Sequence, residues 1–209
     1  MIVIFDLDGT LTNSEEGITK SVQYALRHYG IEEDISRLRR FIGPPLSRSF
    51  MKFYSFSERQ AKEAVSVYRE YYSEKGIFEN KVYPGIPELL ALLRSKGIRL
   101  AVGSSKPEVY VRKILDHFDL EQYFDLIVGS NLDETMTDKK EIIEKVIHEL
   151  GRDEKTIMVG DRIFDRNGAE QTGVKFIGVT YGFAGPYEFD GVAHTAADTK
   201  ELEETILTM

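Results

Sequence analysis

The sequence predicts an α/β protein with a doubly wound parallel sheet and an inserted helical domain, and three observations support this class. The chain begins with a short apolar run that stops at two aspartates. From about residue 83 to residue 179, strand and helix patterns alternate, which is typical of a parallel sheet with helices on both faces. Between these two parts, residues 15–80 contain only helical patterns. A change of structural class inside one chain indicates an inserted domain.

The first strand is predicted over residues 2–5, where four apolar residues in a row are typical of a strand buried on both faces. Asp6 and Asp8 follow it, and they would point to the same side if the strand stayed regular. Gly9 then allows a sharp turn. An Asp-Gly turn is common at the end of a strand, but two neighbouring carboxylates also repel each other unless a cation or a proton lies between them.

The inserted segment is predicted to be helical because its apolar residues recur at three- and four-residue spacing and are punctuated by glycine and proline. The predicted helices cover residues 18–29, a short piece near 38–42, a segment from about Ser47, and residues 58–73. The loop at 43–46, Gly-Pro-Pro-Leu, is stiffened by its prolines. We therefore expect a helical domain of residues 15–81, inserted into a core made of residues 1–14 and 82–209.

The remaining elements of the predicted core follow in alternation. Strands are predicted over residues 98–102, 124–128, 156–159 and 174–179. Helices are predicted over residues 87–96, 109–118, 139–150 and 165–172. In such a sheet, ligands bind outside the carboxyl ends of the strands, at the point where the strand order reverses. The residues that follow each strand are therefore the first candidates for a functional site.

Composition restricts the classes of function. The 209 residues carry a net charge of −8 and include no cysteine. The negative charge argues against binding to a nucleic-acid polymer or to an anionic membrane surface, and the lack of cysteine excludes disulfides and thiolate metal sites. No stretch approaches the roughly 18–20 apolar residues that span a bilayer, and the start lacks the basic region of a signal peptide. We expect a cytoplasmic protein, either a monomer or a weak homodimer, that acts on a small molecule.

Polar side chains gather at the predicted carboxyl edge of the sheet. The candidates are Asp6, Asp8, Ser104, Lys139, Asp161 and Asp165. Taken singly, each has an ordinary structural explanation: Ser104 and Asp165 could cap helices, and Lys139, with Lys140 as an adjacent alternative, could be a solvated charge at a helix end. Their joint occurrence at consecutive strand ends favours a site instead.

Four motifs resemble, in order, those of the haloacid dehalogenase (HAD) superfamily: D-L-D-G-T at 6–10, V-G-S-S-K-P at 102–107, T-D-K-K-E at 137–141 and G-D-R-I-F-D at 160–165. The resemblance implies a HAD-like Rossmannoid core with a small helical cap domain inserted after the first strand, and it favours Lys139 over its neighbour. G-P-P-L at 43–46, S-K-P at 105–107 and V-T-Y-G at 179–182 resemble the phosphoglycolate-phosphatase-like group, including members described as 5′-nucleotidases.

Phosphate monoesters hydrolyse extremely slowly without help, and a carboxylate nucleophile divides the reaction into two easier steps through an aspartyl-phosphate. Asp6 fits the nucleophile, and Asp8 fits the acid that protonates the leaving oxygen and then the base that activates water. The resemblance implies the same roles. Ser104 and Lys139 would bind the phosphoryl oxygens as charge develops.

Magnesium is the expected cofactor because it prefers oxygen ligands. Asp6, the backbone carbonyl of Asp8, and Asp161 would supply the protein ligands. Asp165 would ligate the metal or, more simply, orient a bound water or hold the catalytic lysine. For the substrate, Pro44 and Arg48 are weaker candidates in the predicted helical domain, where the loop at 43–46 is expected to touch the leaving group.

Several other functions compete with a phosphatase. A calcium-binding EF-hand fails because, counting from Asp6, position six is Leu11 rather than glycine, and a strand precedes the loop. The standard phosphate-binding loops of nucleotide-binding proteins are absent. A dehalogenase is disfavoured because it does not need Asp8. A phosphomutase of the same superfamily stays open, since it shares all four motifs, and so does the choice among phosphoglycolate, a nucleoside monophosphate and a sugar phosphate.

Overall fold

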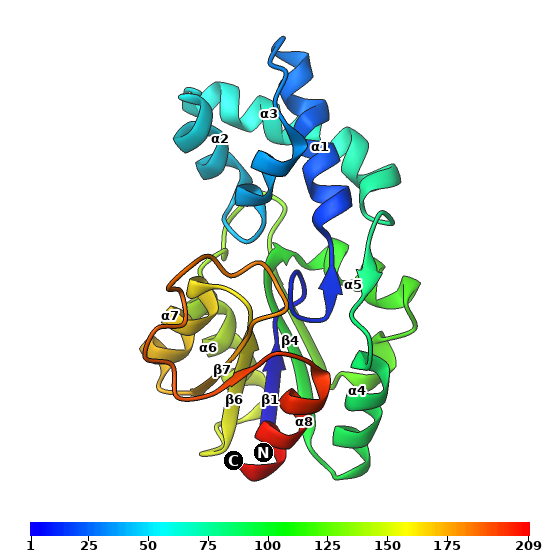
Figure 1. Cartoon of the computed structure of the whole chain (residues 1–209), viewed down its shortest axis with the longest axis vertical. Helices are drawn as coiled ribbons and strands as arrows, with labels where there is room; N and C mark the ends of the chain where they lie inside the picture. The colour runs from blue at the N-terminus through cyan, green and yellow to red at the C-terminus, as the bar shows by residue number, and fades with distance from the viewer. The chain divides into compact units, whose positions relative to one another are not determined.

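Six strands form one parallel sheet in the computed structural model, which describes all residues 1–209 (Figure 1). The strand order is β5-β4-β1-β6-β7-β8. The strands are β1 (Ile2–Phe5), β4 (Arg99–Pro107), β5 (Leu126–Ser130), β6 (Thr156–Gly160), β7 (Lys175–Val179) and β8 (Thr195–Ala196). The predicted α/β class is confirmed, and the sixth strand, which has only two residues, is an addition to it.

β1 lies at the centre of the sheet, paired in parallel with β4 on one side and β6 on the other. All four of its residues are fully buried. Ile2 and Ile4 belong to one hydrophobic cluster with Met158 and the apolar face of the helix that begins at Lys139. The ring of Phe5 packs edge-to-face against the ring of Phe124, with their centroids 6.4 Å apart. An unbroken apolar run is required here because both faces of the strand are covered.

Helices cover both faces of the sheet. α6 (Lys139–Leu150) and α7 (Ile163–Thr172) pack against each other and against the sheet. α4 (Ile86–Ser95) packs on β4 and on α8 (Thr199–Thr208), and α5 (Glu108–His117) packs on β4 and β5. Right-handed crossovers place α4 and α5 on the face opposite α6 and α7, because the strand order reverses at β1. None of the helices combines the length and apolar character needed to span a bilayer.

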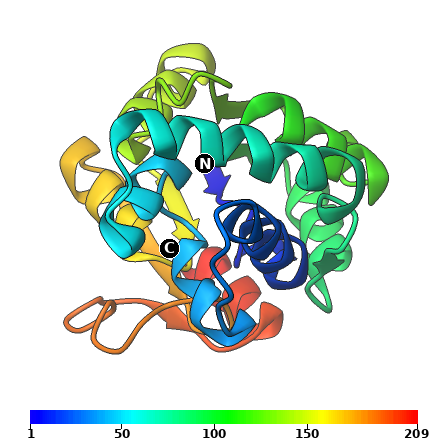
Figure 2. The same ribbon diagram turned by 90° about the horizontal axis from the view of Figure 1, so that it is seen from above.

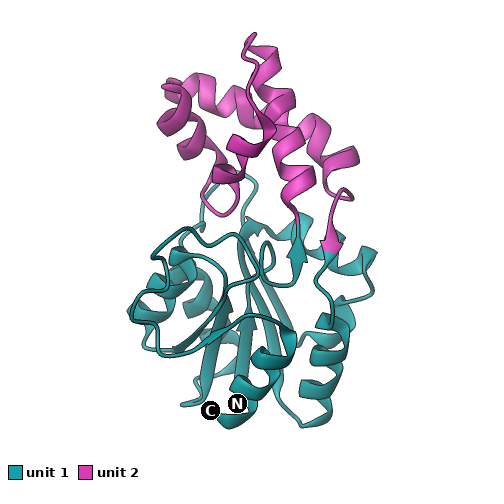
Figure 3. Ribbon diagram, viewed as in Figure 1, with its two compact units in different colours: residues 1–13, 82–209 teal, residues 14–81 magenta.

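The chain divides into two compact units, residues 1–13 with 82–209, and residues 14–81 (Figure 3). Apart from Lys81, which begins a short paired strand, the regular elements of the second unit are helical. It contains α1 (Glu15–His28), a 3-10 helix (Ile35–Phe41), α2 (Leu46–Tyr54), α3 (Glu58–Tyr71) and a π-helical turn (Tyr72–Gly76). Its aromatic core includes Phe41 and Phe50, with ring centroids 5.0 Å apart. Figure 2 views α1 nearly along its axis, with α3 running across it. A two-stranded sheet pairs β2 (Thr12–Asn13) with β3 (Lys81–Val82).

Several elements begin or end a few residues away from their predicted boundaries, and two of these differences affect the packing or the pairing of the chain. The helix expected to end at 73 instead ends at Tyr71 and widens into the π-helical turn, where Gly76 approaches the backbone of Gly17 so closely that a side chain on Gly17 would overlap it. β4 extends to Pro107, but its pairing with β5 shifts register between Gly103 and Pro107. This irregular end of β4 carries the predicted Ser104.

Candidate active site

A tight turn directly after β1 carries the first motif. The N–H of Asp6 still donates to the carbonyl of Val159, at 2.9 Å, so this residue remains attached to the neighbouring strand. The chain then folds over the carbonyl of Leu7, which accepts the N–H groups of Thr10, Leu11 and Thr12. Gly9 adopts a φ of +84°, and a side chain there would overlap the carboxylate of Asp161. The turn therefore needs glycine and brings Asp6 close to β6.

Three buried carboxylates meet at the carboxyl edge of the sheet. Asp6 follows β1, Asp161 follows β6, and Asp165 lies in the first turn of α7. One oxygen from each lies within 4.8 Å of the others, and the residues are 8%, 0% and 1% exposed. The structure thus brings together three of the residues predicted from consecutive strand ends.

Lys139 joins this cluster. Asp138 caps α6 by accepting the N–H of Lys140, which places Lys139 in the first turn. From there its Nζ lies 2.9 Å from Asp6 Oδ1 and 2.8 Å from Asp165 Oδ1, and it donates to the carbonyl of Gly103 at 2.8 Å. Burial alone would lower the pKa of Lys139, but the two carboxylates outweigh burial and raise it. Lys140 instead pairs with Glu144 on the exposed side of the helix.

Both carboxylate oxygens of Asp165 contact groups of the protein. Oδ1 pairs with Lys139, and Oδ2 accepts the N–H of Arg162 at 3.0 Å, which closes the first turn of α7. Burial raises the pKa of Asp165 despite the neighbouring ammonium, and the negative charge of Asp6 adds to the effect. This arrangement suits a residue that holds the lysine.

Asp161 has one oxygen without a partner. Oδ2 accepts the N–H of Phe183 at 2.6 Å, whereas Oδ1 is buried and makes no hydrogen bond. Burial, reinforced by the charges of Asp165 and Asp6, raises the pKa of Asp161 well above its ordinary value. The ammonium of Lys139 pairs with Asp6 and Asp165, and neither ion pair includes Asp161. The donor set therefore fits a divalent cation with oxygen ligands, which would satisfy Asp161 Oδ1 and balance the charge.

A second buried ion pair lies beside this cluster. Lys106 Nζ is 2.8 Å from Asp8 Oδ1, and the two side chains are 8% and 12% exposed. The N–H of Lys106 also lies 3.3 Å from Oγ of Ser104, which is 2% exposed. In the sequence, Lys106 stood out only as part of the S-K-P motif. Its position two residues after Ser104, at the end of a strand, was the signal that it belongs to the site.

The segment after β7 also belongs to the site, although its V-T-Y-G motif served only to suggest a subgroup. Phe183 anchors Asp161, and the hydroxyl of Tyr181 donates to the carbonyl of Thr10 at 3.0 Å. A side chain on Gly182 would overlap both the carbonyl of Gly9 and Asp161. The segment therefore packs its backbone directly against the turn after β1 and against β6.

Glu188 fixes the far end of the same segment. Its carboxylate accepts the N–H of Ile163 at 2.7 Å, the N–H of Gly185 at 3.0 Å and the Nε of Arg162 at 3.1 Å. Burial alone would raise the pKa of Glu188, but these donors outweigh it and lower the pKa. The loop is thus tied to the start of α7, directly after Asp161.

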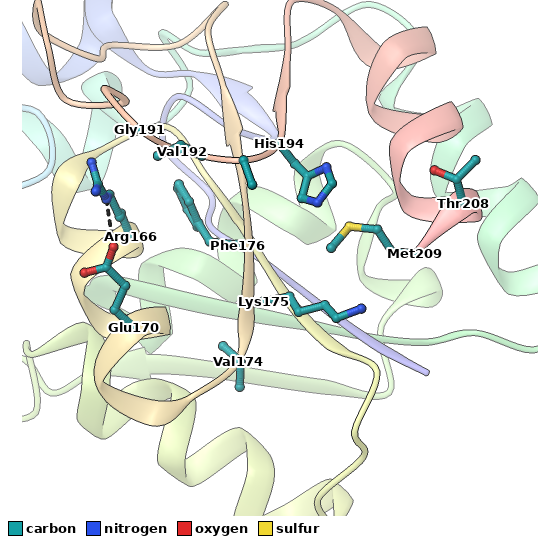
Figure 4. A pocket seen from close by; sticks show the side chains of 11 residues that line it. Arg166, Glu170, Val174, Lys175, Phe176, Gly191, Val192, His194, Thr208 and Met209 are labelled. Carbon is teal, nitrogen blue, oxygen red and sulfur yellow. Dashed lines mark hydrogen bonds and ion pairs between the residues drawn. The ribbon is translucent and has the colours of Figure 1, made fainter.

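Two predicted substrate residues lie in the helical unit. Pro44 precedes α2, and Arg48 is on its first turn. Their role in substrate choice stays a prediction. A separate pocket of about 550 Å³ lies on the core between α7, β7, the end of α8 and residues 191–194, with Lys175 and His194 among its lining residues (Figure 4). None of the clustered carboxylates lines it.

The fold and the cluster define an α/β protein with three buried carboxylates and a buried lysine at the carboxyl edge of its sheet. Residues 3–179 match the haloacid dehalogenase-like hydrolase family, and the chain belongs to this family. The family expected from the four motifs is thereby confirmed.

Similar proteins agree on the fold and carry several names. A 5′-nucleotidase from Pseudomonas aeruginosa is 46% identical over 208 residues, which cover 98% of this chain and 94% of that protein. The tyrosine-protein kinase PtkA of Mycobacterium tuberculosis is 38% identical over 213 residues, 98% of this chain and 72% of that protein. A crystal structure of a predicted phosphatase from Clostridium acetobutylicum matches with a TM-score of 0.95 and 46% identity, covering 100% of this chain and 98% of that one. Further relatives are named phosphoglycolate phosphatase and pyrophosphatase.

Proposed function

We propose that this phosphatase hydrolyses a small phosphate monoester, with magnesium as its cofactor, through an aspartyl-phosphate on Asp6. One observation carries the proposal. The Asp6 carboxylate forms an ion pair with buried Lys139 and lies within 4.8 Å of two further carboxylates. The charges needed to hold a nucleophilic carboxylate, a metal and a phosphoryl group are therefore all present at one edge of the sheet.

In the first step, a carboxylate oxygen of Asp6 attacks phosphorus, and the bond from phosphorus to the ester oxygen breaks. The electron pair stays on that oxygen, and Asp8 gives it a proton. Lys139 pairs with Asp6, and together with the Ser104 hydroxyl it binds the equatorial phosphoryl oxygens, on which charge accumulates. In the second step, Asp8 takes a proton from water, the water oxygen attacks phosphorus, and Asp6 leaves as a carboxylate with release of phosphate.

Asp6, Asp161 and the backbone carbonyl of Asp8 would hold the magnesium ion, which supplies positive charge to the reacting phosphoryl group. The partnerless oxygen of Asp161 supports this assignment. Asp165 does not need to bind the metal in this scheme, since both of its oxygens already hold parts of the protein. It positions Lys139 and the first turn of α7.

The physiological ester is a nucleoside 5′-monophosphate or phosphoglycolate, and the 46% identity to a 5′-nucleotidase favours the nucleotide. The helical unit is where specificity is expected to lie. A phosphomutase uses the same chemistry with a sugar phosphate as acceptor. The relative named as a tyrosine-protein kinase makes tyrosine a further acceptor that must be tested alongside water.

The test is a panel of phosphate esters assayed by released phosphate, with magnesium and with excess chelator. Wild-type protein should release phosphate only with the metal, and Asp6→Asn should be inactive while keeping its fold, because an amide is a poor nucleophile. Mass spectrometry should verify that the introduced amide has not deamidated back to the acid. Phosphate release by intact Asp6→Asn would refute the mechanism. Isomerised phosphosugar would instead identify a mutase, and phosphotyrosine formed from ATP would identify a kinase.

A further inference from the structure

The buried pair of Lys106 and Asp8 includes a lysine that has no part in the two chemical steps. Nζ of Lys106 is 2.8 Å from Oδ1 of Asp8, across 98 positions of sequence. Neither side chain is more than 12% exposed. Burying an ion pair costs desolvation that a surface pair avoids, so the position of this pair calls for an explanation beyond stability.

The backbone around Lys106 is held on both sides. The side chain of Ser105 donates to the carbonyl of Thr137 at 2.9 Å, and Pro107 is registered against Ser130 on β5. The N–H of Lys106 lies against Oγ of Ser104. The irregular end of β4 therefore holds the backbone of Lys106 in a fixed position, from which its side chain reaches Asp8.

Asp8, by contrast, lies on a turn. Its main chain forms only an isolated bridge with Thr12, beyond the end of β1. The site has two ammonium groups with separate partners, because Lys139 pairs with Asp6 and Asp165 while Lys106 pairs with Asp8. A carboxyl group that must donate a proton to the leaving oxygen and later accept a proton from water must point in a defined direction.

We infer that Lys106 is a positioning residue that fixes the direction of the Asp8 carboxyl group toward the oxygen of the leaving group. This inference rests on the proposed function, since it assigns a purpose to Lys106 only if Asp8 transfers protons. The effect of Lys106 on kcat/KM should then be larger for esters whose leaving group depends more on receiving a proton. A poor leaving group such as an alkoxide needs it fully, whereas 4-nitrophenolate leaves without it.

The test compares Lys106→Met with wild type on an alkyl phosphate, phenyl phosphate and 4-nitrophenyl phosphate. The quantity is kcat/KM, which reports only the steps up to formation of the phosphoenzyme. General acid catalysis contributes about 10²–10⁴-fold, so kcat/KM should fall about 100-fold for the alkyl ester, less for phenyl phosphate and under about 3-fold for 4-nitrophenyl phosphate. A burst of 4-nitrophenol should also appear, because the second step still needs Asp8 to activate water.

The controls separate positioning from binding and from folding. Ser104→Ala should lower kcat/KM for all three esters by a similar factor, because it acts on the phosphoryl group that they share. Lys140→Met, on the exposed side of α6, should change none of them. Lys106→Arg should recover part of the loss with the alkyl ester. If Lys106→Met does not fold, as judged by circular dichroism and thermal melting, Lys106→Gln gives the same comparison.

An equal fall for all three esters, or no fall, would overturn the positioning role. Either result leaves the proposed function intact as long as wild type releases phosphate and Asp6→Asn does not. If wild type releases no phosphate from any ester, the proposed function itself fails, and the two failures are thereby distinguished.

Discussion

The main-chain N–H of Phe183 donates to Oδ2 of Asp161 at 2.6 Å, and this contact leaves Oδ1 of the same carboxylate buried without a partner. One oxygen is thus fixed by the loop after β7, while the other belongs to the cluster with Asp6 and Asp165. Without a cation, the charge on Asp161 is opposed by burial and by its two acidic neighbours. The site therefore carries an electrostatic cost that a bound metal would remove.

Asp161→Asn should stabilise the metal-free protein and abolish its response to magnesium. The amide oxygen can still accept from Phe183, and the amide N–H groups can donate to the neighbouring carboxylates. We expect the free energy of unfolding in chelator to rise by about 1–3 kcal/mol. Thermal melts with and without magnesium measure both effects.

In the same melts, wild type should be stabilised by magnesium, by about 2.7 kcal/mol at a hundredfold excess over the dissociation constant. Asp190→Asn, on the loop after β7 and outside the carboxylate cluster, should behave like wild type. A magnesium-dependent shift that survives in Asp161→Asn would place the metal elsewhere. Calcium should bind but support turnover poorly, because its looser coordination would misplace the nucleophile.

Lys139→Met should destabilise the protein severely as well as inactivate it. The change removes the single ammonium among three buried carboxylates. Removing one partner of a buried ion pair costs about 3–5 kcal/mol, because the remaining charge is left uncompensated. Urea unfolding measures the loss, and Lys140→Met is the matched control on the exposed side of the helix. Equal stability of the two variants would contradict this account of the cluster.

Glu188 should contribute stability that depends on pH. Its pKa is lowered in the folded protein from an ordinary value of 4.5, so its contribution is present above that pH and is lost as the pH falls through the folded pKa. At pH 7, Glu188→Gln should lower the free energy of unfolding by about 1–3 kcal/mol, as expected for hydrogen bonds to a charged group.

The difference between wild type and Glu188→Gln should shrink as the pH is lowered below 4.5. Glu170→Gln removes an exposed partner of Arg166 on the same helix and should change little at either pH. A constant difference across the pH range would show that the Glu188 effect is one of packing and not of charge.

Substitutions in the helical unit should change which ester is preferred without changing the dependence on metal. Pro44→Ala and Arg48→Ala are the variants, and kcat/KM for a nucleoside monophosphate, phosphoglycolate and a sugar phosphate is the measurement. We expect their ratios to shift by about tenfold, the order expected when a few contacts to a substrate change. Arg59→Ala, at an exposed position of α3, is the control. A uniform change for all esters would assign the loop at 43–46 to folding alone.

Much of the core could be predicted from the sequence because it is encoded locally. The apolar run of β1 and the alternation of strands with amphipathic helices follow from periodicity, and α6 begins and ends where the pattern predicts. The carboxylates and Ser104 could be predicted because parallel strands end at a common edge. β8 and α8 were missed, since a two-residue strand has no detectable period and α8 buries only Leu202 and Ile206.

By itself, the sequence determined the class of fold and most of the polar groups that lie at the carboxyl edge of the sheet, because strand ends and helix starts are properties of short segments. Only the tertiary structure decided which group faces which. The order of the strands brings Lys106 to Asp8 across 98 positions. The packing of α6 and of the loop after β7 brings Lys139 to Asp6 and Phe183 to Asp161. Such partnerships depend on strand register and on loops folding back over the sheet edge, and neither leaves a periodic signal in the chain.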